Sequence, residues 1–191
     1  MHRQPLLQLL RQHVPADANE AAMTAQTIAF VEANPACFER SLQTGHVTGS
    51  AWILSPDPST TNVPEEPKAL LIHHRKLDRW FQPGGHADGN PDVQAVARQE
   101  AEEETGLTNL RLASPQIFDV DIHPIPARNE GTADAIPAHL HYDIRFQYFS
   151  NDQILLGENR EVKNTQWVTL DEAERLSDSE SISRMVRKSR I

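Results

Sequence analysis

Residues 84–107 of this 191-residue chain read GGHADGNPDVQAVARQEAEEETGL, and this stretch decides the fold. From Pro91 to Thr105 the sequence predicts a helix. Asn90 suits the cap, Pro91 suits the first helical position, and Gly106 lies where a helix commonly ends. Ahead of the helix, Pro83 and two glycines predict a turn, and a Gly-Gly pair lets the backbone approach a ligand or an ion closely. The segment therefore predicts a glycine-rich turn followed by a helix.

Three glutamates continue the face of this helix that ought to be buried. At about 100° per residue, Val93, Val96 and Ala97 mark the inward sector, and Glu102 points away from it. Three acids fall in or beside that sector: Glu100, Glu103 and Glu104. Carboxylates crowded at the end of a helix repel one another and oppose the helix dipole, so the cluster requires a cation. Oxygen ligands suit Mg²⁺ or Mn²⁺. A solvated acidic helix end is the alternative interpretation.

The same segment resembles the Nudix box. The family pattern is glycine, five residues, glutamate, seven residues, arginine-glutamate, an aliphatic residue, any residue, two glutamates, any residue, glycine and an aliphatic residue. With Gly85 at the first position, Ala101 takes the first aliphatic place. Five further residues agree in register: Glu100, Glu103, Glu104, Gly106 and Leu107.

Two positions depart from the family pattern. Pro91 stands where the family has glutamate, and Gln99 stands where it has arginine. In the family these two residues form a supporting ion pair, and both members are missing here. Arg98 cannot take the place of the arginine, because an adjacent residue points about 100° around the helix. We expect metal binding to survive, whereas the glycine-rich loop loses a support.

The resemblance covers the chain from about Val47 to Arg175. Residues 80–86 (WFQPGGH) and 164–172 (NTQWVTLDE) are similar to elements that flank the box in the family. The resemblance implies an α/β fold, a Nudix-type α/β/α sandwich with a mixed β-sheet. We assign residues 46–191 to this domain, including a C-terminal helix, and residues 1–45 to an N-terminal helical extension.

The remaining helices and strands are predicted from the periodicity of apolar residues and from the residues that commonly end such elements. From Pro5 to about Leu42 the chain reads helical, with Asp17 or Asn19 as the cap of a second helix. Further segments are expected as strands at 47–54, 69–74, 117–122, 140–149 and 165–169, and as helices at 171–176 and 181–187. In the last helix a basic face is expected to be exposed to solvent: Arg184, Arg187, Lys188 and Arg190.

The resemblance also implies roles for the residues of the site. Glu100, Glu103 and Glu104 would hold Mg²⁺ or Mn²⁺, with the main-chain carbonyl of Gly85 or its neighbour completing the shell. The general base would be one of these carboxylates or a loop acid, Glu158 or Glu161. We therefore expect four catalytic residues: Glu100, Glu103, Glu104 and Glu161.

A second polar pattern runs along two other predicted strands. Asp119, Asp121 and His123 alternate along one strand, and four residues alternate along the next: His139, His141, Asp143 and Arg145. If the strands pair as a hairpin, their polar faces meet. The pattern predicts substrate contacts or a second metal site, against the alternative of a half-solvated sheet face. With Trp80, which could stack on a base, the expected substrate-binding residues are His123, His139, His141, Asp143 and Arg145.

Composition narrows the class of protein. The chain carries 18 Lys and Arg against 27 Asp and Glu, a net charge of -9, which argues against a partner that is a nucleic-acid polymer. The single cysteine, Cys37, excludes disulfides within the chain and fits a reducing compartment. The apolar cluster in residues 1–10 is too short to span a bilayer. We expect a cytoplasmic protein that has no membrane partner; a homodimer contact is the alternative role for its first helices.

The implied activity is hydrolysis of a diphosphate bond in a nucleoside diphosphate linked to another moiety, a small-molecule substrate. Pro124 lies near the position where ADP-ribose hydrolases of the family carry a proline, which favours an ADP-ribose-like or nucleotide-sugar-like substrate. A Nudix-fold sensor that binds a nucleotide without cleaving it is the alternative. An isopentenyl-diphosphate isomerase would need a catalytic cysteine, and Cys37 lies well before the box.

Overall fold

The computed structural model describes residues 2–60, 66–129, 131–132, 135–152 and 160–190. Its helices are α1 (Gln4–Gln12), α2 (Ala18–Ala33), α3 (Val93–Thr105), α4 (Leu170–Ser177) and α5 (Glu180–Ser189). Its strands are β1 (Gly45–Ser55), β2 (Lys68–His74), β3 (Arg79–Phe81), β4 (Gly84–His86), β5 (Arg111–Leu112), β6 (Asp119–Ile125), β7 (His139–Phe149) and β8 (Val162–Thr169). Within these residues, no helix combines the length and apolar character that crossing a membrane requires.

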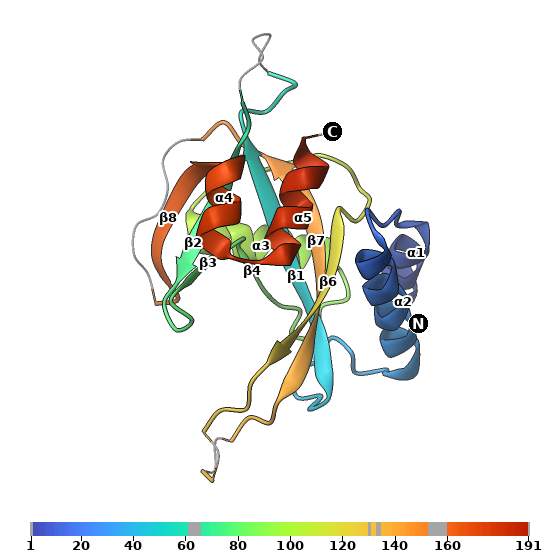
Figure 1. The fold of residues 1–191 in the computed structure, drawn as a ribbon. Helices are drawn as coiled ribbons and strands as arrows, with labels where there is room; N and C mark the ends of the chain where they lie inside the picture. Colours follow the sequence, from blue (N-terminus) through green and yellow to red (C-terminus); the bar gives the residue numbers. More distant parts are fainter. Residues whose placement is uncertain (1, 61–65, 130, 133–134, 153–159, 191) are drawn as a thin grey trace.

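Helices cover both faces of one mixed sheet. The path of the sheet is β3-β2-β1-β7-β5, with β4 paired to β1, β6 to β7 and β8 to β2. Strands β1 and β7 run parallel, whereas β1 is antiparallel to β2 and β4. In Figure 1, α4 and α5 lie in front of the sheet and α3 lies behind it. The predicted α/β/α sandwich with a mixed sheet is therefore confirmed.

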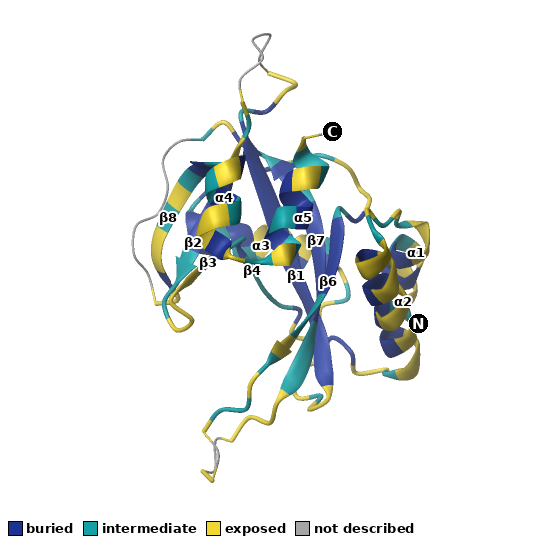
Figure 2. Ribbon diagram, viewed as in Figure 1, coloured by how far each residue is buried: buried dark blue, intermediate teal, exposed yellow. Residues whose placement is uncertain are grey.

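Alternate residues of β1 serve two hydrophobic cores. Ala51 and Ile53 pack in the core that contains Val96 and Ala97 of α3. Trp52 packs on the other face of the sheet, in the core that contains Met185 of α5. Because both faces are covered, β1 is buried along its whole length, as Figure 2 shows.

The two N-terminal helices belong to the first core. Leu6 and Leu10 of α1 and Phe30 of α2 are buried in it, and the Phe30 ring stacks on Tyr142 of β7 with centroids 3.8 Å apart. Asp17, one of the two predicted caps, accepts a hydrogen bond from the Glu20 amide at 2.8 Å. The division of the chain at residue 45 into an extension and a domain stays a prediction.

Two local predictions around the glycine-rich segment were wrong. Helix α3 begins at Val93, and its cap is Asp92, whose carboxylate accepts from the Ala95 amide at 3.0 Å; Asn90 instead accepts from the Asp92 amide. Gly84 and Gly85 lie in strand β4, because their backbone finds hydrogen-bonding partners on β1. Gly106 does end α3, in the left-handed conformation at φ 75° that glycine tolerates.

The predicted hairpin of polar strands is confirmed. Strands β6 and β7 pair antiparallel, with Asp119 opposite Arg145, Asp121 opposite Asp143 and His123 opposite His141. At Asp119 and Asp121 the polar face of the hairpin is not half-solvated, because α5 covers it. Arg184 of α5 binds Asp119 through two contacts of 2.8 Å. The sheet face there is an interior surface.

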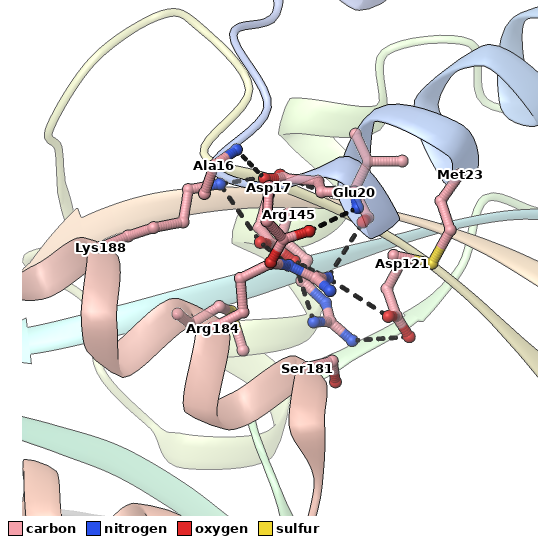
Figure 3. A network of polar contacts seen from close by, with 12 residues as sticks. Ala16, Asp17, Glu20, Met23, Asp121, Arg145, Ser181, Arg184 and Lys188 are labelled. Atoms are coloured by element: carbon pink, nitrogen blue, oxygen red, sulfur yellow. Dashed lines mark hydrogen bonds and ion pairs between the residues drawn. The ribbon is translucent and has the colours of Figure 1, made fainter.

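The prediction of an exposed basic face on the last helix was therefore wrong for two of its residues. Arg184 is 1% exposed and contacts Asp119 and Asp121, and Lys188 binds Glu20 at 2.7 Å and Asp119 at 3.2 Å. Figure 3 shows these side chains of α5 converging with Arg145 on the acids of α2 and β6. Buried charges of this kind persist only when they are paired.

Candidate functional site

Two of the three predicted ligands point from α3 toward strand β4. The Gly84 amide donates a hydrogen bond to Oε2 of Glu104 at 2.9 Å, and Glu104 is only 6% exposed. A Cβ atom at Gly85 would lie 2.3 Å from Cδ of Glu100, so a side chain there would displace the Glu100 carboxylate. The glycine pair therefore lets β4 and the acidic end of α3 approach closely.

Glu103 lies on the exposed side of the cluster. Its Oε1 accepts a hydrogen bond of 2.8 Å from Nε2 of Gln99, the residue that stands in place of the family's arginine. Arg98 instead pairs with Glu102 at 2.8 Å, one helical turn on. Gln99 thus orients the Glu103 carboxylate without neutralising it, which leaves its negative charge available to a cation.

Burial and mutual repulsion disfavour the charged forms of the other two glutamates. Burial is the main reason that the pKa of Glu104 is raised to about 8, and it raises the pKa of Glu100 to about 7. The negative charges of Glu103 and Glu161 raise both pKa values further. A divalent cation would remove this penalty, so the oxygen donor set fits the metal that the sequence predicts. Glu158, the other predicted base, lies outside the described residues.

These pKa values predict how the metal-free protein responds to pH. Because the folded-state pKa of Glu104 lies above its ordinary value of 4.5, folding binds a proton at that site, and stability falls as the pH rises from about 4.5 to about 8. In EDTA at pH 8, the Glu104→Gln variant should therefore be more stable than the unaltered chain. The expected gain is about 1.4 kcal/mol for each pH unit by which the folded-state pKa of Glu104 exceeds its unfolded-state pKa, up to pH 8.

Urea unfolding at pH 5 and pH 8 measures this effect as the difference between the two proteins. The buried histidines are present in both proteins, so their contribution to the pH dependence cancels in the difference. Adding Mg²⁺ at pH 8 should stabilise the unaltered chain and have little effect on the variant. A difference that does not change with pH would contradict the expected environment of Glu104.

The N-terminal segment supports the loop between β4 and α3. The Arg40 guanidinium donates to both carboxylate oxygens of Asp88, at 2.5 Å from Nε. At the next residue, the Gly89 amide donates to the Phe38 carbonyl at 2.9 Å. Arg40 also lies close enough to Glu100 to lower its pKa. These contacts support the loop where the family's ion pair is missing. They could not be predicted from the sequence, because they join residues that are far apart along the chain, 48 positions for Arg40 and Asp88.

Removal of this support should reduce activity more than stability. Arg40→Ala is expected to lower kcat/KM by roughly 10–100-fold, as loss of an outer support around a metal site commonly does. The free energy of unfolding should change by only about 0–1 kcal/mol, because the ion pair is exposed. Arg11→Ala is the matched control, since Arg11 forms an equally exposed pair with Glu32. Equal activity in the two variants would refute the supporting role.

The predicted substrate-binding residues separate into two groups. Arg145 is 2% exposed and binds Asp119 and Asp121 as well as Asp143, which also accepts from Ser50 at 2.7 Å. The Arg145 guanidinium and the Asp143 carboxylate are thus paired within the protein, and their roles in substrate binding stay predictions. Trp80 stacks on His73 with centroids 4.9 Å apart.

The histidines form the other group, and it is larger than predicted. His123 and His139 each lie 5.3 Å from His141 between ring centroids. His46 of β1 and His86 of β4 join them, at 4.8 Å and 5.1 Å from the same ring. Sequence reasoning missed both, because His46 reaches the cluster through the parallel pairing of β1 with β7 and His86 was read as part of a loop.

The comparisons with known proteins agree with this architecture. The model of the NUDIX domain family matches residues 57–188, which is more than half of the chain. Among curated proteins, none matches the sequence. A solved Nudix hydrolase from M. smegmatis, RenU, is 17% identical with a TM-score of 0.53, and the match covers 76% of this chain and 84% of that one.

Two further solved structures are similar. The Ap4A hydrolase of C. elegans, in a binary complex, is 17% identical with a TM-score of 0.52, over 75% of this chain and 94% of that one. A NUDIX-family hydrolase from Clostridium perfringens is 20% identical with a TM-score of 0.50, over 75% and 95%. At these identities the structures show a shared fold, and the family model carries the assignment: the chain belongs to the NUDIX domain family.

Proposed function

We propose that the protein hydrolyses the diphosphate bond of a nucleoside diphosphate linked to another moiety, with Mg²⁺ or Mn²⁺ as its cofactor. The observation that carries this proposal is the carboxylate cluster at the end of α3. Glu104 is held on the Gly84 amide, and Glu100 is packed over Gly85. Burial and the neighbouring carboxylates keep the pKa values of both glutamates raised.

In this proposal Glu100, Glu103, Glu104 and the main-chain carbonyl of Gly85 hold the divalent cation. When bound, it would neutralise the diphosphate oxygens and orient them for attack. The attacking water must also lose a proton to a nearby base as it bonds to phosphorus. One of the three carboxylates or Glu161, whose charge reaches Glu100 and Glu104, would accept that proton.

The substrate class rests on the surroundings of the cluster. A net charge of -9 disfavours long polyanions, whereas a small diphosphate can approach through a bound cation. Arg40 lies close enough to Glu100 to lower its pKa and brings a positive charge near the cluster. ADP-ribose and nucleotide sugars have this chemistry, and Trp80 offers an aromatic surface for a base. A cytoplasmic location and a homodimer stay predictions.

A substrate screen tests the proposal. ADP-ribose, nucleotide sugars, dinucleoside polyphosphates, NADH and nucleoside triphosphates should be offered with Mg²⁺ or Mn²⁺, and products should be separated by chromatography. We expect cleavage of a nucleoside diphosphate derivative that stops when EDTA is added. No turnover of any compound, together with tight binding of ADP-ribose by calorimetry, would favour the non-catalytic sensor instead.

A further inference from the structure

Five histidines gather on the sheet face opposite α3. Across the strands, His46 of β1 lies beside His141 of β7, and His141 lies beside His123 of β6. His86 of β4 lies opposite Thr48, two residues along from His46. The rings of His46 and His86 are 5.0 Å apart, and the rings of His46 and His139 are also 5.0 Å apart. The side chains come from four strands, so the sheet itself fixes their positions.

The central rings of this cluster have unsatisfied nitrogen atoms. His46 is 3% exposed, and neither of its ring nitrogens has a hydrogen-bonding partner; Nε2 of His141 is also buried without one. Buried polar atoms in native proteins almost always find a partner, because leaving one unpaired is costly. Each of these two rings therefore has a buried nitrogen available to a ligand.

We propose that His46, His86 and His141 bind one first-row transition-metal ion, with Zn²⁺ as the most suitable. In the described part of the chain, these residues are the one set of three or more His, Cys, Asp or Glu side chains whose ligand atoms all lie within 4.8 Å of one another. A tetrahedral Zn²⁺ with bonds of about 2.0–2.1 Å holds its nitrogen ligands about 3.3 Å apart, so small rotations of the rings would close the site. Three histidines would leave a fourth position for water or a further ligand.

The charge state of the rings agrees with this assignment. Burial lowers the pKa of His46 to about 4, and the neighbouring His86 and His139 lower it further. Burial also holds the pKa of His141 far below its usual range. Both rings are therefore neutral near pH 7, and the neutral imidazole is the form that binds a metal.

This site is separate from the carboxylate cluster. Successive residues of a strand point to opposite faces, so Gly85 faces Glu100 of α3 while His86 faces the histidines. The two sites also differ in chemistry, because imidazoles favour Zn²⁺ and related ions whereas carboxylates favour Mg²⁺ and Mn²⁺. The inference thus goes beyond the proposed function and does not depend on it.

Calorimetric titration of the full chain with Zn²⁺ tests the proposal. The protein is first stripped with EDTA and then kept in saturating Mg²⁺, which occupies the carboxylate cluster. We expect one equivalent of Zn²⁺ to bind the unaltered chain and the Glu103→Gln/Glu104→Gln double variant alike. His46→Asn and His141→Gln should each weaken that binding at least about tenfold. His2→Ala removes an exposed histidine that bonds to the Pro35 carbonyl and is not one of the proposed ligands, so it should change nothing.

A second measurement covers the case in which a histidine variant fails to fold. Co²⁺ added to the unaltered chain in excess Mg²⁺ should give the visible absorption of a tetrahedral nitrogen site, and one equivalent of Zn²⁺ should abolish it. Absence of both the calorimetric equivalent and the Co²⁺ spectrum would overturn the proposal. Zn²⁺ binding that survives in folded His46→Asn and His141→Gln variants would overturn it as well.

Discussion

Glu103→Gln and Glu104→Gln are each expected to lower kcat/KM by at least about 10²-fold on any substrate that the protein cleaves. Each change removes one negative oxygen from the cluster that would hold the cation and leaves a side chain of the same size. Loss of a single fixed electrostatic contact to a developing charge already costs on the order of 10²–10³-fold in other enzymes. Steady-state rates across a range of Mg²⁺ concentrations would measure the loss.

Glu102→Gln is the matched control for these two variants. Glu102 lies on the same turn of α3, carries the same charge and pairs with Arg98 instead of facing β4. Its loss should leave kcat/KM within about twofold, since exposed pairs of this kind contribute little. Circular dichroism should show all three variants folded. If the Glu103 and Glu104 variants retained the activity of the control, the assignment of the cluster as the catalytic centre would fail.

Sequence reasoning was most successful where contacts are local. The spacing of Glu100, Glu103 and Glu104 within one helix fixes which of them share a face, so a single stretch of chain carries the site. The hairpin of β6 and β7 was also predictable, because alternation along each strand puts Asp119, Asp121 and His123 on one face whatever lies above it.

It failed where a residue's environment comes from distant parts of the chain. In the sequence, Arg184 looks like a solvent-exposed helix residue. Only the fold shows that it binds Asp119, which lies 65 residues earlier in the chain. His46 precedes the strand predicted at 47–54, and no partner for it is evident until the parallel pairing of β1 with β7 brings His141 beside it. Neither pairing leaves a periodic signal in the sequence, so charge and polarity alone predicted exposure for Arg184 and no role for His46.

Removal of one partner from the buried ion pairs that this reasoning missed should strongly lower the stability of the fold. Arg184→Met is expected to lower the free energy of unfolding by about 3–5 kcal/mol, because it leaves the buried carboxylate of Asp119 short of its closest cation. Arg145 and Lys188 remain near Asp119, at 3.1 Å and 3.2 Å, but each already serves another acid. Urea unfolding monitored by circular dichroism would measure the change.

Arg187→Met on the same helix provides the control, since Arg187 is 51% exposed and pairs with Glu180 at the surface; its loss should cost about 0–1 kcal/mol. The double variant Arg184→Met/Asp119→Asn separates two explanations of a large effect. If the cost comes from an unpaired buried charge, removal of the acid as well should restore part of the stability. If it comes from lost packing, the double variant should be no more stable than Arg184→Met. Recovery would show that α5 is held on the sheet by charge pairing, so that Asp119 and Arg184 must be retained or replaced together.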